Sequence, residues 1–245
     1  MGRAKDIIVK VIPSNVANEF VKKHHYSGKV VANSQIHFGA FLDNKLHGVM
    51  SFGPSTDKSK IITLVKNTKW NEFIELNRMA FDEYLPKNSE SRCISIALKL
   101  IKKNAPHIKW VISFADGCQC GDGTIYRASG FKLTGIKKNK TILIMPDGST
   151  IAGLNLDLQL STVKSKYDKM CGLKPSGHYT RNDYIKGGAK WLEGNMLRYI
   201  YFIDKEKEKD LTVPIISFSK IDELNAGMYK GERISMEERK KQLDE

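Results

Sequence analysis

Phe73-Ile-Glu-Leu-Asn-Arg-Met-Ala-Phe81 decides the fold, because it opens a block of alternating strands and helices that ends at Phe131. The composition of this run favours a β-strand. The apolar side chains of the next stretch recur at helical spacing, which predicts a helix that Ser89 or Ser91 caps and that Pro106 ends. The block therefore begins with a strand, a loop and a helix.

A second strand and a shorter helix complete the block. Trp110-Val-Ile-Ser-Phe-Ala115 is a short apolar run typical of a strand buried on both faces, and Asp116-Gly117 closes it. The helix is expected from Thr124 to Ser129, with Gly130 at its end. Strands that alternate with helices pair in parallel, and a parallel sheet binds its ligands beyond the carboxyl ends of its strands. Residues 77–82 and 113–116 form those ends.

The sequence of this block resembles a known superfamily. Glu75-Leu-x-Arg78-Met-Ala80, a capped helix, a buried strand and Tyr126-x-x-Ser-Gly-Phe131 resemble the core of the GNAT acyltransferases over roughly the first 140 residues. With Ser113-Phe-Ala-Asp116 and Gly123-Thr-Ile-Tyr-Arg-Ala-Ser-Gly-Phe131 added, the chain is similar to the phage Mom proteins over most of its length. The resemblance implies a mixed α/β (α+β) fold, in which helices flank a strongly twisted central sheet.

The Mom resemblance also implies an activity. Mom proteins are GNAT-like enzymes that modify adenine in phage DNA. The implied reaction is carbamoylmethylation of adenine N6, which protects the phage genome from host restriction. Double-stranded DNA is then the expected partner, and the cytoplasm of the bacterial host is the expected location.

The strand pairing of a GNAT core implies an insertion. Lys132–Ile136 continues the sheet, and the next strand of comparable character is Met196–Ile203. A GNAT core pairs these two strands directly. We therefore expect a GNAT-like core over residues 1–139, an insertion over residues 140–195, and the last core strand with a C-terminal tail over residues 196–245.

The residues before the central block predict a strand, a helix and a hairpin. Ile7–Ile12 favours a strand, and Pro13-Ser14 opens a helix that ends near His24. Phe38–Leu42 and Leu46–Phe52 read as a hairpin, because the Asx residues between them tolerate the turn conformation.

Charge and cysteine content narrow the class of protein. The 245 residues contain 40 Lys or Arg against 27 Asp or Glu, so the net charge of +13 favours polyanionic partners such as nucleic acid. Four Cys residues in no regular framework favour a reduced, intracellular protein. The sequence contains no apolar run long enough to span a bilayer, and its start has no apolar signal core.

The insertion is the candidate DNA-contacting segment. Lys, Tyr and Gly residues are frequent from Val163 to Trp191, and basic residues among aromatics suit a nucleic-acid surface. We expect Lys164, Lys166 and Lys169 to be exposed there. The alternative is a solvated, loosely helical cover.

Asp116 and Tyr126 are the candidate catalytic residues. Asp116, at the end of the buried strand, suits a general base or a ligand, although Asp-Gly is also ordinary turn chemistry. The GNAT resemblance places Tyr126 where many members hold the tyrosine that protonates a departing thiolate. Its alternatives are a hydrogen-bond donor to substrate or a ring packed on the sheet. Ser113 shares the strand face of Asp116.

Two further groups are candidates for binding substrate. His25, Tyr26 and Ser27 lie in a polar loop, whose counterpart in GNAT folds helps to form the acceptor side of the cleft. Asn77 and Arg78 are adjacent on a strand, so we expect only one of them to face the cleft. Asn suits paired hydrogen bonds to adenine, and Arg suits phosphate.

The cofactor is left open by the sequence. Ser89, Ser91 and Arg92 could bind an anion at the start of the helix. However, residues 82–92 lack the glycines of the usual GNAT pyrophosphate loop, so the use of acetyl-CoA is in question. The loop of His25, Tyr26 and Ser27, together with Asp116, also offers N and O ligands for a metal such as iron.

Three hypotheses follow. The first is a Mom-like DNA-modifying enzyme. The second is an acetyl-CoA-dependent N-acetyltransferase that acts on a small amine or a protein. The third is a non-catalytic DNA-binding module that has kept the fold and lost the cofactor loop.

Overall fold

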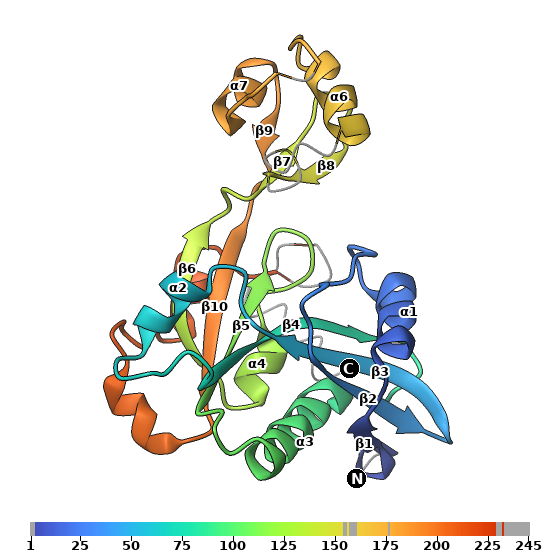
Figure 1. Cartoon of the computed structure of the whole chain (residues 1–245), viewed down its shortest axis with the longest axis vertical. Coiled ribbons are helices and arrows are strands. Elements are labelled where there is room, and N and C mark those ends of the chain that lie inside the picture. Colours follow the sequence, from blue (N-terminus) through green and yellow to red (C-terminus); the bar gives the residue numbers. More distant parts are fainter. Residues whose placement is uncertain (1–2, 154–155, 157–160, 176, 229–231, 233–245) are drawn as a thin grey trace. The chain divides into compact units, whose positions relative to one another are not determined.

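The computed structural model describes residues 3–153, 156, 161–175, 177–228 and 232. The chain forms two compact units, which Figure 1 shows with their elements labelled. Unit 1 consists of residues 1–136 and 197–245, and unit 2 consists of residues 137–196.

Unit 1 is built on a seven-stranded mixed sheet with the strand order β1-β2-β3-β4-β5-β10-β6. The strands are β1 (Ile8–Val11), β2 (Ile36–Leu42), β3 (Lys45–Gly53), β4 (Phe73–Phe81), β5 (Trp110–Asp116), β10 (Asn195–Phe202) and β6 (Lys132–Lys138). The first four strands pair antiparallel, whereas β4 and β5 pair in parallel. Because β10 lies next to β6, the expected GNAT-like class with an insertion between its last two core strands is confirmed.

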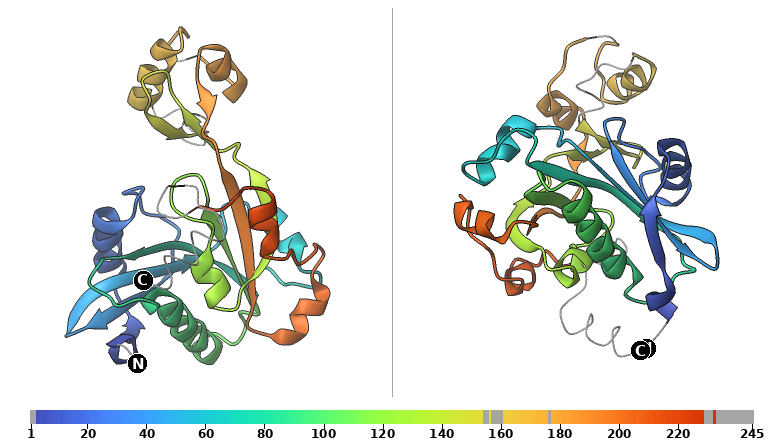
Figure 2. Two further views of the ribbon diagram at one scale, coloured as in Figure 1. Left: turned by 180° about the vertical axis from the view of Figure 1, so that it is seen from behind. Right: turned by 60° about the horizontal axis from the view of Figure 1, so that its bottom comes forward.

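Helices cover both faces of this sheet. The helical elements of unit 1 are η1 (Arg3–Asp6), α1 (Ser14–His24), α2 (Lys58–Ile61), η2 (Ile62–Leu64), α3 (Ser89–Asn104), α4 (Thr124–Ala128), η3 (Lys205–Asp210) and α8 (Ser219–Glu223). Figure 2 shows them from two further sides. The main core joins α3 and α4 to one face, where Leu76 and Ile94 are buried. A separate cluster packs Val21 of α1 against Val49 and Ala80 on the other face.

The local sequence explains the turn between β2 and β3, whereas the start of α3 differs from the prediction. The hairpin between β2 and β3 turns through Asp43 and Asn44, whose φ values of 50° and 60° suit a two-residue turn that matches strand twist. Helix α3 begins at Ser89, but its N-cap is Asn88, with a φ of 67° and no side-chain capping bond. The predicted cap by Ser89 or Ser91 is therefore wrong.

Unit 2 has its own sheet and core. Its strands β7 (Ile142–Ile144), β8 (Thr150–Ala152) and β9 (Lys190–Trp191) lie in the order β8-β7-β9, with helices α6 (Ser161–Met170) and α7 (Arg181–Lys186). Thr180 and Asp183 form a capping box at the start of α7. The buried residues of its core are Leu143, Met145, Ile151, Leu156, Tyr167, Cys171, Tyr184 and Ala189.

A buried ion pair lies in unit 2. Lys164 is 4% exposed, and its Nζ donates to Oδ2 of Asp168 at 2.7 Å and to the carbonyl of Gly177 at 2.8 Å. Tyr184 donates to the other oxygen of the same carboxylate at 2.6 Å. The expectation that Lys164 is exposed is therefore wrong, because its i,i+4 partner and the surrounding core hold it inside.

Two general expectations can be compared with the described residues. All four cysteines are free, and three of them, Cys93, Cys118 and Cys171, are buried. Among the residues that the structure describes, no helix has the length and apolar character needed to cross a membrane.

Candidate active site

The carboxyl ends of β4 and β5 part from each other. The two strands are nine and seven residues long, yet only three residue pairs join them, the last being Glu75 with Ile112. The hydroxyl of Ser113, which is fully buried, donates to the carbonyl of Leu76 at 2.9 Å. This bond satisfies a carbonyl that the ladder would otherwise engage, and the strands open beyond it.

A β-bulge in β4 shapes the same region. Ser51 of β3 pairs with Arg78, but Phe52 pairs with Leu76, so Asn77 has no partner in the ladder. The bulge shifts the alternation of side chains, because Leu76 and then Met79 pack on the main core. Asn77 and Arg78 both line the pocket where β4 and β5 part, so the expectation that only one of them faces the cleft is wrong.

The pocket at this opening lies within unit 1 and has a volume of about 360 Å³. This volume is at the lower end of the range for small-molecule sites, about 300–1,000 Å³. Of the residues expected from the sequence, it is lined by His25, Tyr26, Asn77, Arg78, Asp116 and Tyr126. Ser27, Ser89, Ser91, Arg92 and Ser113 do not line it.

Tyr26 and Asp116 meet across the pocket. The phenol of Tyr26 donates to Oδ2 of Asp116 at 3.1 Å, and Oδ1 accepts the backbone N–H of Cys118 at 3.0 Å. Burial, followed by the charge of Asp116, raises the pKa of Tyr26 above its usual value. The carboxylate of Asp116 thus shapes its turn and also faces the pocket.

His25 is held as a neutral imidazole. Its Nδ1 accepts the backbone N–H of Ser27 at 3.1 Å and lies 2.8 Å from the hydroxyl of Ser27. Since a backbone N–H can only donate, the neutral ring carries its proton on Nε2. Burial, with the nearby positive charge of Arg78, lowers the pKa of His25 to about 4. Ser27 therefore orients His25 from outside the pocket.

Tyr126 both packs on the sheet and lines the pocket. Its ring centroid lies 5.4 Å from that of Phe131 and 5.3 Å from that of Tyr199. Burial raises the pKa of Tyr126 to about 12, an effect that hydrogen bonding with Ser113 partly offsets. The phenol consequently stays protonated at neutral pH and can act as a donor.

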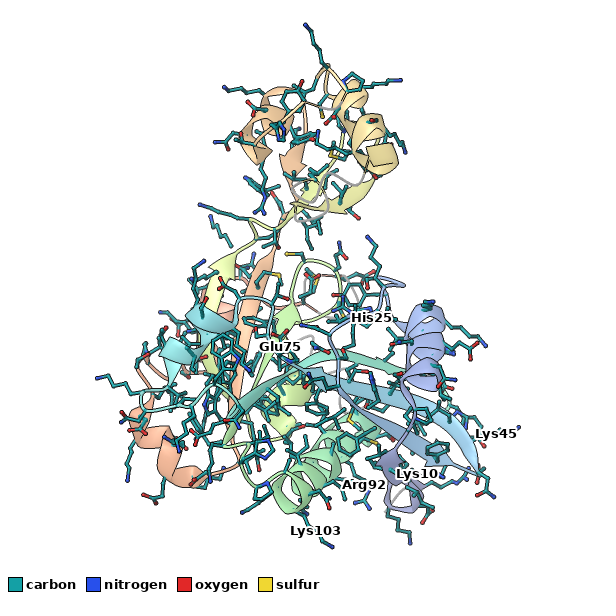
Figure 3. The ribbon with its side chains drawn as sticks, viewed as in Figure 1. Lys10, His25, Lys45, Glu75, Arg92 and Lys103 are labelled. Carbon is teal, nitrogen blue, oxygen red and sulfur yellow. The ribbon has the colours of Figure 1, made fainter. Side chains whose placement is uncertain are left out.

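Arg78, which was expected to contact substrate, has a charged neighbour in Glu75, which was not predicted as a site residue. Arg78 donates through Nε to the carbonyl of Lys29 at 2.9 Å, which ties β4 to the loop after α1. Burial raises the pKa of Glu75, whereas a hydrogen bond with Ser55 and the charge of Arg78 oppose the rise. Figure 3 marks His25 and Glu75. A glutamate inside the otherwise apolar run that begins β4 was the available signal.

The start of α3 does not fit the pyrophosphate of CoA, the cofactor that the GNAT resemblance implies. Ser89 is fully buried, and its hydroxyl donates to the carbonyl of Pro86. Arg92 is exposed and donates to the carbonyl of Lys5 at 3.1 Å; Figure 3 shows it far from His25. The residue of this turn that lines the pocket is Glu90, whose carboxylate repels phosphate.

Metal ligands are sparse in the same region. Among the described residues, no group of three or more His, Cys, Asp or Glu side chains is placed to hold a metal. Of the residues suggested for iron, His25 already uses its Nδ1 within its own loop, and Asp116 is the single carboxylate. These residues do not form a closed metal centre.

A mixed sheet whose parallel central strands part to open a pocket, with helices on both faces, defines a GNAT-like α/β protein. The Mom protein family matches residues 6–220, and the chain belongs to that family. It is 32% identical over 213 residues to the methylcarbamoylase Mom of Escherichia phage Mu, a match that covers 86% of this chain and 82% of that protein.

Solved acetyltransferase structures are also similar to the chain, at low identity. The spermidine/spermine N-acetyltransferase SpeG from Vibrio cholerae is 8% identical, with a TM-score of 0.45 and coverage of 85% of this chain and 99% of SpeG. The ribosomal-protein-S18-alanine N-acetyltransferase from Escherichia coli is 8% identical, with a TM-score of 0.42 and coverage of 80% and 94%.

Proposed function

We propose that this protein is a Mom-like transferase that modifies adenine N6 in double-stranded DNA, by carbamoylmethylation, and so protects a phage genome from host restriction. Its place of action is the cytoplasm of the bacterial host. One observation supports the proposal. This chain belongs to the Mom family, and its fold brings residues from the loop after α1, from β4, from the end of β5 and from α4 into one pocket.

The chemistry assigns a role to each group in the pocket. When a carbon–nitrogen bond forms at N6 of adenine, the amino group must lose a proton. The carboxylate of Asp116 is placed to accept that proton, and the hydrogen bond from Tyr26 holds it in position. Tyr126, with its pKa raised to about 12, supplies a proton to the departing group. Neutral His25 and cationic Arg78 contact the nucleotide.

Access to adenine N6 requires the base to leave the duplex. A flipped base is bound in a pocket by stacking and by hydrogen bonds to its edges. Tyr26, whose ring lies 4.3 Å from that of His25, offers an aromatic face at the pocket, and Asn77 and Arg78 offer polar groups.

Unit 2 is our candidate for further contacts with DNA. Its 60 residues contain ten Lys or Arg against five Asp or Glu. Lys169, Lys174 and Lys186 are exposed, whereas Lys164 is buried and cannot take part. Exposed lysines neutralise backbone phosphates without reading the sequence.

Mass spectrometry of nucleosides tests the proposal directly. DNA from cells that express the protein should yield a deoxyadenosine with the added mass of a carbamoylmethyl group, and DNA from cells that express Asp116→Asn should not. Unmodified DNA from cells with a well-folded wild-type protein would contradict the proposal. Acetyl-CoA turnover with a free amine would then favour the N-acetyltransferase alternative, which the position of Glu90 opposes. Salt-sensitive DNA binding without either activity would favour a binding module.

A further inference from the structure

Residues 203–228 follow β10 and run along unit 1 (Figure 2, left, orange to red), and Met228 of this segment lines the pocket. The backbone N–H of Ile216 donates to the carbonyl of Leu133 on β6 at 2.8 Å. The guanidinium of Arg127 lies 4.8 Å from the ring centroid of Phe218, so the segment also packs beside α4. It then forms the short helix α8.

Two apolar residues anchor the end of this segment. Ile221 and Ala226 are 5% and 3% exposed and belong to the main core, whereas Leu224 between them is 53% exposed. The chain reverses at Asn225, where φ is 48°, and the N–H of Ala226 returns to the carbonyl of Ile221 at 2.7 Å. The residues that follow are thereby directed to the loop after β5.

Two hydrogen bonds join Met228 to Asp122 in the loop after β5. The N–H of Asp122 donates to the carbonyl of Met228 at 3.2 Å, and the N–H of Met228 donates to Oδ2 of Asp122 at 3.4 Å. Met228 is 6% exposed and lines the pocket beside the loop that carries Cys120 and Gly121. Residues 221–228 lie beyond the stretch 6–220 that the family match covers.

We propose that residues 221–228 place Met228 in the wall of the active-site pocket, and that Met228 is a specificity residue that restricts the pocket to a compact donor of the transferred group. The inference rests on the proposed function. A methionine suits this role because its unbranched, apolar side chain fills irregular space. The pocket of about 360 Å³ has to hold both the base and the donor, so a residue in its wall determines how large the donor can be.

Alkylation of Cys120 tests the wall without any need for enzymatic activity. Cys120 lines the pocket and is exposed, whereas the other three cysteines are buried. The rates of its reaction with iodoacetamide and with the much larger fluorescein-5-maleimide are measured by peptide mass spectrometry at one pH. Their ratio cancels any change in the pKa of the thiol. Unreactive Cys93 and Cys171 report that the protein is folded.

The variants differ in the space that they leave. Met228→Ala should raise the rate with the maleimide several-fold relative to the rate with iodoacetamide. Met228→Leu, which keeps the volume, and Leu224→Ala, an exposed position on the same segment, should keep the wild-type ratio. If the ratio of the two alkylation rates is unchanged in Met228→Ala, Met228 does not form part of the pocket wall, whether or not the protein modifies DNA.

The product distribution gives the functional test. In expressing cells, Met228→Ala should yield deoxyadenosine adducts of more than one mass, whereas wild type and Met228→Leu yield one. If wild type modifies DNA and Met228→Ala gives the same single product at the same rate, the specificity role is wrong. If wild type leaves DNA unmodified, the proposed function fails, and the alkylation ratio still decides whether the wall exists.

Discussion

The phenol of Tyr26 donates a 3.1 Å hydrogen bond to the carboxylate of Asp116, a residue 90 positions further along the chain. The bond joins the loop after α1 to the end of β5, beyond the last residue pair that joins β5 to β4. A base that enters the pocket meets both residues. Asp116 is therefore the group whose replacement is the most informative.

Asp116→Asn should abolish DNA modification, because an amide cannot accept the proton of adenine N6. The side chain keeps an oxygen for the N–H of Cys118, so the turn and the affinity for DNA should not change. Asp57→Asn, at an exposed aspartate paired with Lys60, is the matched control and should keep full activity. Modification is measured by nucleoside mass spectrometry. Full activity in a folded Asp116→Asn protein would show that Asp116 only stabilises its turn and does not accept the proton.

Tyr126→Phe should lower the rate of modification by about 10²- to 10⁴-fold, the usual loss when a general acid is removed. The ring contacts with Phe131 and Tyr199 remain in this variant, so stability should change little. Tyr201→Phe, on β10 and packed against Phe131, is the control. Equal rates for the two variants in a single-turnover assay would show that the phenol of Tyr126 takes no part in proton transfer.

His25 should make the protein less stable as the pH falls from about 6.5 to about 4. Its pKa is about 4 in the folded protein, against an ordinary value of 6.5 in the unfolded chain, so over this range the unfolded chain binds a proton that the folded chain does not. Above pH 6.5 the imidazole is neutral in both states and contributes no such dependence. Urea unfolding of His25→Gln should show a flatter decline than wild type. His107→Gln, at an exposed histidine, should follow the wild-type curve.

Lys164→Ala should destabilise unit 2 by about 3 kcal/mol or more, because it leaves the buried carboxylate of Asp168 without its cationic partner. Lys166→Ala is a close control, since Lys166 pairs with Asp147 at the surface, and such pairs contribute at most about 1 kcal/mol. Hydrogen exchange of the amides in residues 137–196 measures the difference. Equal protection in the two variants would contradict the importance of the buried pair.

Replacing Lys169, Lys174 and Lys186 together by Ala should weaken duplex binding and reduce its salt dependence. Each phosphate contact contributes roughly 0.9 to the slope of log K against log salt, so the slope should fall by up to about 3. Lys99, Lys102 and Lys103 on α3 are exposed as well, and their triple replacement removes the same charge from unit 1. A slope that falls equally in both triple variants would argue against a DNA surface on unit 2.

The order of strands and helices could be predicted from the sequence because buried strands and helices have distinct apolar periodicities. The run Trp110–Ala115 indicated β5, and the Asx residues at positions 43 and 44 indicated the turn of the first hairpin. His25, Tyr26 and Asp116 could be chosen because polar residues in loops and at strand ends suit a binding site, and Tyr126 could be chosen from the resemblance to the GNAT acyltransferases; all four line the pocket.

The remaining features depend on partners that are distant in the sequence. The bulge at Asn77 is defined by its register with β3, so the residues of β4 alone do not reveal it. Lys164 was expected at the surface because its buried partner, Asp168, and the core of unit 2 are not evident from the sequence. Met228 belongs to no motif, and only the path of the chain brings it to the pocket.

The entry and exit of unit 2 are adjacent. The N–H of Asn139 donates to the carbonyl of Gly194 at 3.0 Å, and its side chain bridges the carbonyls of Ile142 and Leu192 at 2.9 and 2.8 Å. Strands β6 and β10 are already neighbours, so a short reverse turn could replace the 60 residues between them. The sheet of unit 1 therefore does not depend on unit 2 to bring β6 beside β10.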